Sequence, residues 1–237
     1  MATSFAFKPI VTDGLVLCLD AGNTKSYPGS GTSWLDLTSN ANNGTLTGSP
    51  TFNSANGGSL QFNGSGQYVT TGPTVYPSKT NFTLNSFWRF NKSKSNALFS
   101  STGGGAYTND VLFAYDSGSL GGILFFQINN GADGSAYTTR SYTSLSWINI
   151  CVVFDGSQAT NQGKLKVYID GVLENLTYGY TVPSSTSGTN WSSYFGTYAA
   201  SSGWDLLGNI AFAHIYNRSL TAAEVLQNYN ATKNRFI

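Results

Sequence analysis

The chain has 237 residues, of which 10% are charged, and its formal net charge is +1. The absence of a basic run excludes nucleic-acid binding, which depends on phosphate neutralisation by clustered Lys and Arg. The lack of a run of ~20 apolar residues argues against a membrane span, and residues 1–14 do not have the pattern of a secretory signal.

In chain order, residues 1–12 are expected to form an N-terminal arm, followed by a single domain over 13–237. Residues 14–20, "GLVLCLD", are apolar on both faces and predict a central strand of a sandwich. Residues 22–58 are rich in Gly, Ser, Thr and Asn, so long loops with short strands are expected there.

Two segments have the signature of β-hairpins. Residues 58–71, "GSLQFNGSGQYVTT", predict a hairpin that turns at Gly64-Ser65-Gly66. In "VYIDGVLENLTY", the pair Asp170-Gly171 suits a two-residue type I′ turn between alternating arms.

The remaining strand-like segments are of two kinds. Residues 82–90 and 164–170 alternate apolar and polar side chains, which predicts one buried and one wet face. Residues 122–128 and 148–154 are apolar on both faces and predict central strands, whereas 181–204 predict another long loop. The sequence therefore favours an all-β sandwich of antiparallel sheets.

One helix is predicted, over residues 222–230. Thr221 and Glu224 have the spacing of a capping box, in which each side chain satisfies a backbone N–H of the other residue. Four apolar residues follow on one helical face: Ala222, Val225, Leu226 and Tyr229. So short a helix is marginal in water, so it is expected to dock on the sandwich.

Candidates for catalysis are few. A glycosidase needs two carboxylates across one cleft, but the only glutamates are Glu174, beside a predicted turn, and Glu224, in the capping box. The single histidine, His214, lies in a strand-like run and is interpreted as a structural residue satisfied by a neighbour. No catalytic residue is assigned, and the chain is not expected to be an enzyme.

Other chemistry remains open. Asp20, Asn23 and Asp36 supply oxygen atoms that could bind calcium, the only cofactor considered, although such residues also make turn hydrogen bonds. Cys18 and Cys151 lie in apolar runs and form either two buried free thiols or a disulfide.

Aromatic residues in loop-like contexts are candidates for carbohydrate binding, because sugars stack on such rings. The set comprises Trp191, Tyr194 and Tyr198, all in "SGTNWSSYFGTY". Aromatic residues of this kind also plug the edges of cores, so both interpretations stay open.

Several stretches together resemble the laminin-G-like domains of the concanavalin A-like lectin/glucanase superfamily. They are "VTDGLVLCLDAGNTKSYPGSGTSWLDLTSNANNGTLTGSPTF", "GGSLQFNGSGQYV", "KLKVYIDGVL" and "GNIAFAHIYNRSLTAAEVLQNYNATKNRF". The resemblance covers residues 11–237 and implies a jelly-roll sandwich with one C-terminal helix and no catalysis. The position of Cys18 is commonly Tyr in the family, which favours a buried thiol.

The chain departs from the family pattern at two places. Phe62-Asn63-Gly64 is followed by Ser65-Gly66-Gln67, where the family usually has Phe-Asp-Gly and two acidic residues. Thr38-Ser39-Asn40 stands where Ser-Gly-Asn is usual. Both differences remove features of the family pattern, and the first thins out acidic ligands, so the expectation of calcium is lowered.

The pairing of "GLVLCLDAGN" with "YNRSLTAAEVLQNYNATK" resembles structural proteins of tailed bacteriophages. It implies a virion protein of the capsid, tail or fibre, located in the virion and oligomeric in the assembly, with other virion proteins as partners. The alternative is an adhesion module that binds cell-surface glycans, and a glycosidase is the remote alternative.

Overall fold

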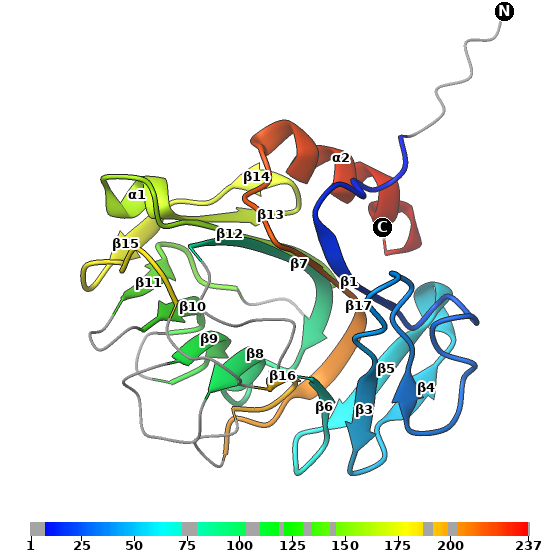
Figure 1. The fold of residues 1–237 in the computed structure, drawn as a ribbon. Coiled ribbons are helices and arrows are strands. Elements are labelled where there is room, and N and C mark those ends of the chain that lie inside the picture. The colour runs from blue at the N-terminus through cyan, green and yellow to red at the C-terminus, as the bar shows by residue number, and fades with distance from the viewer. Residues whose placement is uncertain are drawn as a thin grey trace, which may run out of the picture.

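The computed structural model describes residues 8–72, 80–102, 110–118, 121–129, 134–142, 146–186, 192–198 and 203–236. Two antiparallel sheets face each other, as the sequence predicts for a jelly-roll sandwich (Figure 1). The first, called sheet A, contains β1 (Leu15–Asp20), β4 (Thr51–Asn53), β5 (Ser59–Asn63), β7 (Asn81–Phe90), β12 (Ile148–Asp155), β13 (Leu165–Ile169), β14 (Val172–Leu173) and β17 (Leu207–Tyr216).

The second, called sheet B, contains β2 (Ser33–Trp34), β3 (Gly44–Thr47), β6 (Tyr68–Thr71), β8 (Asn96–Thr102), β9 (Asp110–Asp116), β10 (Ile123–Ile128), β11 (Ser135–Thr138), β15 (Leu176–Tyr178) and β16 (Ser193–Phe195). The helices are α1 (Asn161–Lys164) and α2 (Ala222–Thr232), with single 3₁₀ turns at Ala55–Gly57 and Lys233–Arg235. None of the helices in the described ranges has the length and apolar character of a membrane span.

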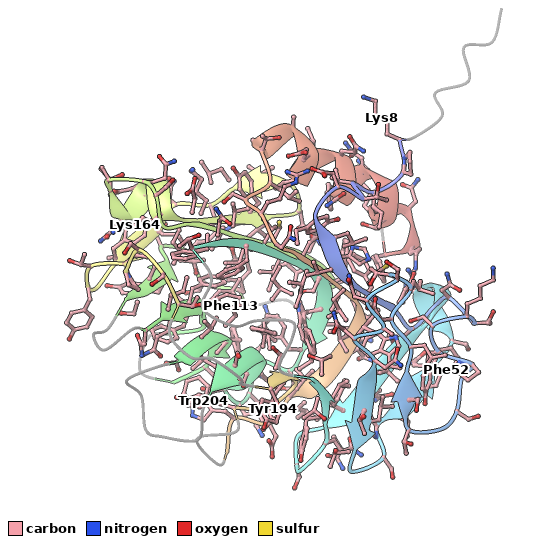
Figure 2. All side chains as sticks on the ribbon, in the orientation of Figure 1. Lys8, Phe52, Phe113, Lys164, Tyr194 and Trp204 are labelled. Carbon is pink, nitrogen blue, oxygen red and sulfur yellow. The ribbon has the colours of Figure 1, made fainter. Side chains whose placement is uncertain are left out.

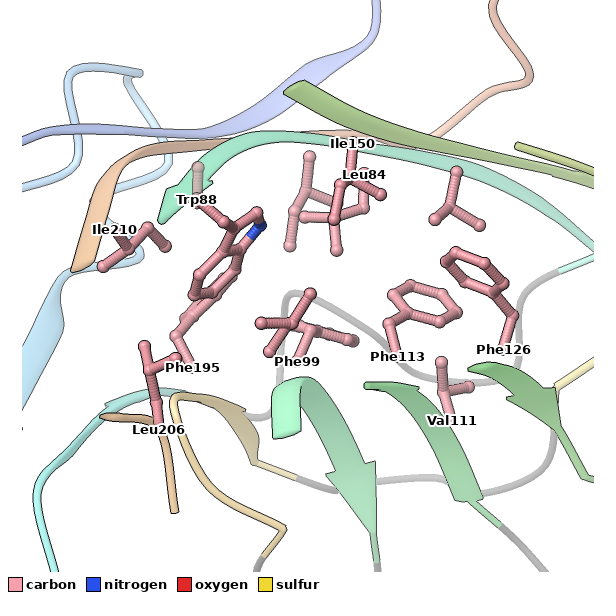
Figure 3. Packing of buried hydrophobic residues seen from close by; sticks show 14 of the residues in the cluster. Leu84, Trp88, Phe99, Val111, Phe113, Phe126, Ile150, Phe195, Leu206 and Ile210 are labelled. Atoms are coloured by element: carbon pink, nitrogen blue, oxygen red, sulfur yellow. The ribbon is translucent and has the colours of Figure 1, made fainter. Parts of the chain in front are cut away.

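The main core fills the space between the sheets. Figure 3 shows Leu84, Trp88 and Ile150 of sheet A pointing toward the phenylalanines of sheet B. The rings of Phe82 of sheet A and Phe113 of sheet B lie 6.5 Å apart. Contact between large buried side chains at this distance is what an alternating strand supplies when its apolar face meets an opposite layer.

Part of the outer face of sheet A is buried as well. This corrects the prediction of a solvent-exposed face on the strand at 82–90 for Thr83 and Asn85, whereas Arg89 is exposed as predicted. Thr83 and Asn85 point outward from β7 but are 0% and 1% exposed. The Thr83 hydroxyl donates to the Arg218 carbonyl at 2.9 Å and accepts from the Leu220 N–H. The segment before α2, and α2 itself, therefore cover this face (Figure 1).

The helix is confirmed, but its docked face differs from the predicted one. Val225 is 1% exposed and packs on Cys151 and Tyr168, whereas Leu226 is 47% exposed. Asn228 is fully buried in the docked face of the helix. Its side-chain amide donates to the Tyr216 hydroxyl at 3.0 Å and accepts from the Val11 N–H at 2.8 Å, so its polar atoms are satisfied there. A polar residue thus joins the helix, the last strand and the segment before β1.

The capping box at Thr221 and Glu224 is formed. The Thr221 hydroxyl accepts from the Glu224 N–H at 3.3 Å, and the Glu224 carboxylate accepts from the Thr221 N–H at 2.8 Å. Glu224 also pairs with Arg218 at 2.6 Å, and the hydrogen bond from Arg218 lowers the pKa of this carboxyl to about 2.

Loss of the cap should weaken the helix measurably. Thr221→Ala is expected to lower the free energy of unfolding by about 1 kcal/mol, because the Glu224 N–H loses its acceptor and the Glu224 carboxylate loses the bond from the Thr221 hydroxyl. Chemical denaturation checks this. Ser54→Ala is the matched control, since Ser54 precedes a 3₁₀ turn without a side-chain capping bond. An equal loss in both variants would contradict the role of the cap.

The predicted hairpin over residues 58–71 is wrong, because its two strands belong to different sheets. Residues 59–71 do not form a hairpin, because β5 pairs with β17 in sheet A while β6 pairs with β3 and β16 in sheet B. The turn at Gly64 and Gly66, both with positive φ, carries the chain from one sheet to the other. Phe62 and Val69 then enter the same core from opposite sides.

The strand at 15–20 is also not central. β1 pairs only with β17, and its other edge is sealed by a polar loop. The Cys18 N–H donates to the Asp36 carboxylate at 2.8 Å, and the Cys18 carbonyl accepts from the Leu37 N–H at 2.9 Å. Closure of the edge by this loop explains an apolar strand at a sheet border.

The two cysteines lie in one row across sheet A but cannot meet. Cys18 pairs with His214, His214 with Asn85, and Asn85 with Cys151. Three strand spacings separate the two Cα atoms by roughly 14 Å, well beyond the ~7 Å limit between Cα atoms in a disulfide. Both are buried free thiols.

Candidate functional site

A pocket of about 200 Å³ lies at the rim where the two sheets meet. The ends of three strands of sheet A line it, and the segment after β11 of sheet B completes it. Its lining residues are Phe90, Lys92, Arg140, Tyr142, Ser146, Trp147, Ile148, Ile169 and Asp170. Aromatic walls with a few convergent polar groups are typical of small-ligand sites.

Tyr142 lies at the centre of a polar network on one wall. Its hydroxyl donates to the Glu174 carboxylate at 3.1 Å and accepts from Arg140 Nε at 3.2 Å. Arg140 also pairs with Glu174 at 2.8 Å. Burial raises the pKa of Tyr142 above its usual range, so the phenol stays protonated and keeps its donor.

Trp147 forms another wall and is held from two sides. Its ring lies 4.9 Å from that of Phe236, and its indole N–H donates to the Asn56 side chain at 3.2 Å. Phe236 in turn stacks on Phe87 of β7 at 4.2 Å. The C-terminal segment thus fixes the orientation of a half-buried tryptophan at the pocket.

Two further charged groups of opposite sign line the pocket. Burial lowers the pKa of the Lys92 ammonium to about 8 and raises that of the Asp170 carboxyl. Asp170 accepts a hydrogen bond from the Asn149 N–H at 2.9 Å and has a φ of 52°, in the predicted two-residue turn with Gly171. This confirms the hairpin of β13 and β14, in which Ile169 pairs with Val172.

The aromatic residues predicted for carbohydrate binding do not converge here. Trp191 lies outside the described residues. Tyr194 is half-buried on β16, 6.0 Å from Tyr68, on the outer side of sheet B (Figure 2). Tyr198 is 2% exposed and packs in an apolar cluster with Ala97, so it cannot serve as an exposed stacking surface.

The calcium candidates are engaged in structural hydrogen bonds. Both Asp20 oxygens accept from Arg235 Nη1, at 2.9 and 3.0 Å. Asp36 accepts from the backbone N–H groups of Cys18, Thr38 and Asn42, and Asn23 accepts from that of Lys25. Within the described ranges, His, Cys, Asp and Glu side chains nowhere gather in threes around a common point.

The residues considered for catalysis are also in structural positions. Glu174 holds Arg140 and Tyr142, and Glu224 holds Arg218 and the helix start. His214 is 3% exposed and stacks on Phe212 at 4.4 Å. Its Nδ1 has no hydrogen-bond partner in the described structure, so the predicted neighbour is missing at this atom.

A second pocket, of about 420 Å³, has no charged lining residue. The rings of Tyr27 and Phe52 lie 5.9 Å apart there, beside Gly, Ser and Thr residues of the loops at 29–32 and 49–51. Phe52 is 37% exposed, and its side chain is labelled in Figure 2. This pocket supplies a comparison site for experiments on the first one.

Sequence reasoning missed Lys92, Tyr142 and Trp147, which the fold brings together from separate connections. One signal in the sequence could have indicated Trp147. It stands directly before the apolar strand at 148–154, at a strand end, where a large aromatic side chain is not needed to fill the core. Nothing in the spacing of the other two indicates a shared pocket.

Residues 63–226 match the family profile described as the concanavalin A-like lectin/glucanases superfamily. A comparison with curated proteins found no match. Among solved structures, domain 4 of AbnA, an extracellular arabinanase from Geobacillus stearothermophilus in complex with arabinotriose, is 17% identical with a TM-score of 0.65, over 91% of this chain and 98% of that one.

Two further structures share the fold. The binding domain of botulinum neurotoxin serotype G is 15% identical with a TM-score of 0.64, over 91% of this chain and 50% of that one. Trypanosoma rangeli sialidase, in complex with 2,3-difluorosialic acid, is 16% identical with a TM-score of 0.68, over 99% of this chain and 35% of that one. The chain therefore spans about half of the neurotoxin binding domain and about a third of the sialidase.

Proposed function

The chain belongs to the concanavalin A-like lectin/glucanases superfamily, and on that basis we propose that it is a glycan-binding module without catalytic activity. The observation that carries the proposal is the convergence of Tyr142 and Trp147 with charged side chains in one rim pocket. Sugars present apolar ring faces and many hydroxyl groups, and such a pocket offers stacking surfaces and hydrogen-bonding groups together. The arabinanase domain with arabinotriose supports the use of this scaffold for sugars.

The absence of catalysis is part of the proposal. Glu174 is 9% exposed and bonded to Arg140 and Tyr142, and Glu224 caps a helix on the outer face of sheet A. A hydrolytic pair needs two carboxylates about 5–10 Å apart on either side of a sugar bond. Release of reducing sugar by the purified protein would contradict this part of the proposal.

Substitution of the pocket aromatics is expected to abolish most glycan binding. Trp147→Ala and Tyr142→Ala should each weaken the affinity for a bound oligosaccharide about tenfold or more, because each removes a stacking surface. Calorimetry on ligands found by a glycan array provides the measurement, and Phe52→Ala in the second pocket is the control. No bound glycan at millimolar concentration, or loss only in Phe52→Ala or Trp191→Ala, would overturn the proposed site.

We also propose that the module is a structural component of a bacteriophage virion, on a capsid, tail or fibre. Support comes from the resemblance of "GLVLCLDAGN" and "YNRSLTAAEVLQNYNATK" to phage structural proteins. In that setting its partners are other virion proteins, it is oligomeric through the assembly, and the glycan site faces outward. Mass spectrometry of purified particles should detect this polypeptide, and its consistent absence from them would reject the proposal.

A further inference from the structure

Lys92 is held in a cage of aromatic rings at the pocket. Its Nζ lies 5.3 Å from the ring centroid of Phe90, 5.6 Å from that of Tyr115 and 5.7 Å from that of Tyr142. The first two rings come from the two different sheets, and the third follows β11. Ring faces attract a cation through their quadrupole, but they carry no net charge and therefore leave the charge of the ammonium uncompensated.

The ammonium of Lys92 has no anionic partner among the described side chains. The ion pairs found there join Arg140 to Glu174, Arg218 to Asp13 and Glu224, and Arg235 to Asp20. Arg140, the other cation of the pocket, is thus already neutralised by Glu174. Lys92 is the pocket cation whose charge is left uncompensated in this part of the chain, while burial disfavours its charged form.

An anionic group on a ligand would supply the missing charge. A carboxylate beside Lys92 would gain a charge-assisted hydrogen bond, and Tyr142 and Trp147 would contact the sugar ring that carries it. Asp170 lines the same pocket and would repel an anion placed next to it, which restricts where the ligand carboxylate can lie.

We propose that the rim pocket selects acidic sugars, with Lys92 as the counter-ion of a sugar carboxylate. The inference rests on the proposed glycan-binding function and names its ligand class. In this proposal Lys92 attracts the sugar carboxylate, and Asp170 repels the same group.

Matched ligand pairs test the charge without changing the size of the sugar. The probes are galacturonate oligomers and sialyllactose, each compared with its own methyl ester, measured by calorimetry at pH 7. At least one acidic member is expected to bind about tenfold more tightly than its neutral partner, a difference of about 1.4 kcal/mol.

Protein variants test the assignment in both directions. Lys92→Gln should remove the roughly tenfold advantage of the acidic sugar over its neutral partner, whereas Lys92→Arg should keep that preference. Asp170→Asn should strengthen binding of the acidic sugar severalfold. It preserves the turn, because Asn tolerates the positive φ of this position and Asn-Gly suits a type I′ turn. Thermal unfolding of each variant checks that the fold is intact.

The pH dependence gives an independent readout. The rings of Tyr115 and Tyr142 flank the Lys92 ammonium, and Arg140 and Asp170 line the same pocket. Glu174 pairs with Arg140. Since the pKa of Lys92 is about 8, the preference of the wild type for acidic sugars should fall between pH 7 and 9, and that of Lys92→Arg should not.

The outcomes separate this inference from the proposed function. If neutral and acidic members bind equally well, or if Lys92→Gln keeps the preference, the acidic-sugar assignment is wrong and glycan binding stands. If the array and both ligand pairs show no binding at all, the proposed function itself fails.

Discussion

Trp88→Ala is expected to lower the free energy of unfolding by about 3–5 kcal/mol, the usual cost of truncating a large aromatic residue in a core. Trp88 is 1% exposed, lies between the two sheets and points toward Phe195 and Phe99 (Figure 3). Its indole N–H also donates to the Ser86 hydroxyl. The change therefore leaves a large cavity and an unpaired buried group, and denaturation at equilibrium measures the loss.

Leu226→Ala is the control for the loss of apolar volume outside the core. Leu226 is 47% exposed on α2, so its truncation should change stability by less than about 0.5 kcal/mol. A small effect of Trp88→Ala, comparable with that of the control, would show that the sheets do not pack as described.

The stability of the domain is expected to fall by about 3 kcal/mol as the pH is lowered from 6.5 to 4, because of His214 alone. Burial lowers the pKa of this imidazole from 6.5 to about 4, with Asp20 acting in the opposite direction and Arg235 in the same one. Below pH 6.5 the unfolded chain binds a proton that the folded chain does not bind. Stability therefore rises with pH across this window and is constant, with respect to this group, above it.

His214 is the single histidine of the chain, so one variant isolates the effect. His214→Gln should remove the dependence between pH 6.5 and 4, whereas the loss assigned to Glu224, whose folded pKa is about 2, should remain between about 4.5 and 2. Urea titrations at a series of pH values give the slopes. Equal slopes for wild type and variant above pH 4 would contradict a buried neutral imidazole.

The fold is predictable from the sequence where local chemistry and tertiary structure agree. The Asp170-Gly171 turn has positive φ at both residues, as its type requires, and the capping box starts α2 where expected. The turn at Gly64-Ser65-Gly66 misleads because a chain reversal looks alike whether its two arms pair or enter different layers. Layer membership depends on partners far away in the sequence, here β17 and β3.

The candidate site is much less predictable. Lys92, Tyr142 and Trp147 occupy three connections that only the closed sandwich brings together, and none belongs to a motif of fixed spacing. Tyr198 shows the converse: a loop-like sequence context suggested an exposed ring, but the ring fills an apolar cluster on sheet B. Composition indicates that aromatic residues are plentiful, and the arrangement of the strands decides which of them stay accessible.

Because part of the outer face of sheet A is covered, a native thiol beneath it can report local opening of the structure. Cys151 is 0% exposed beneath a cluster that includes Val225 of α2, and burial raises the pKa of its thiol above the usual range. A thiol reagent can reach it only while the helix is detached, so its labelling rate measures the opening equilibrium of α2 in native conditions. The labelling rate of Cys18, at the edge of β1 that the loop with Asp36 covers, reports the opening of that loop in the same way. The ratio of the two rates separates detachment of the helix from opening of the sheet border.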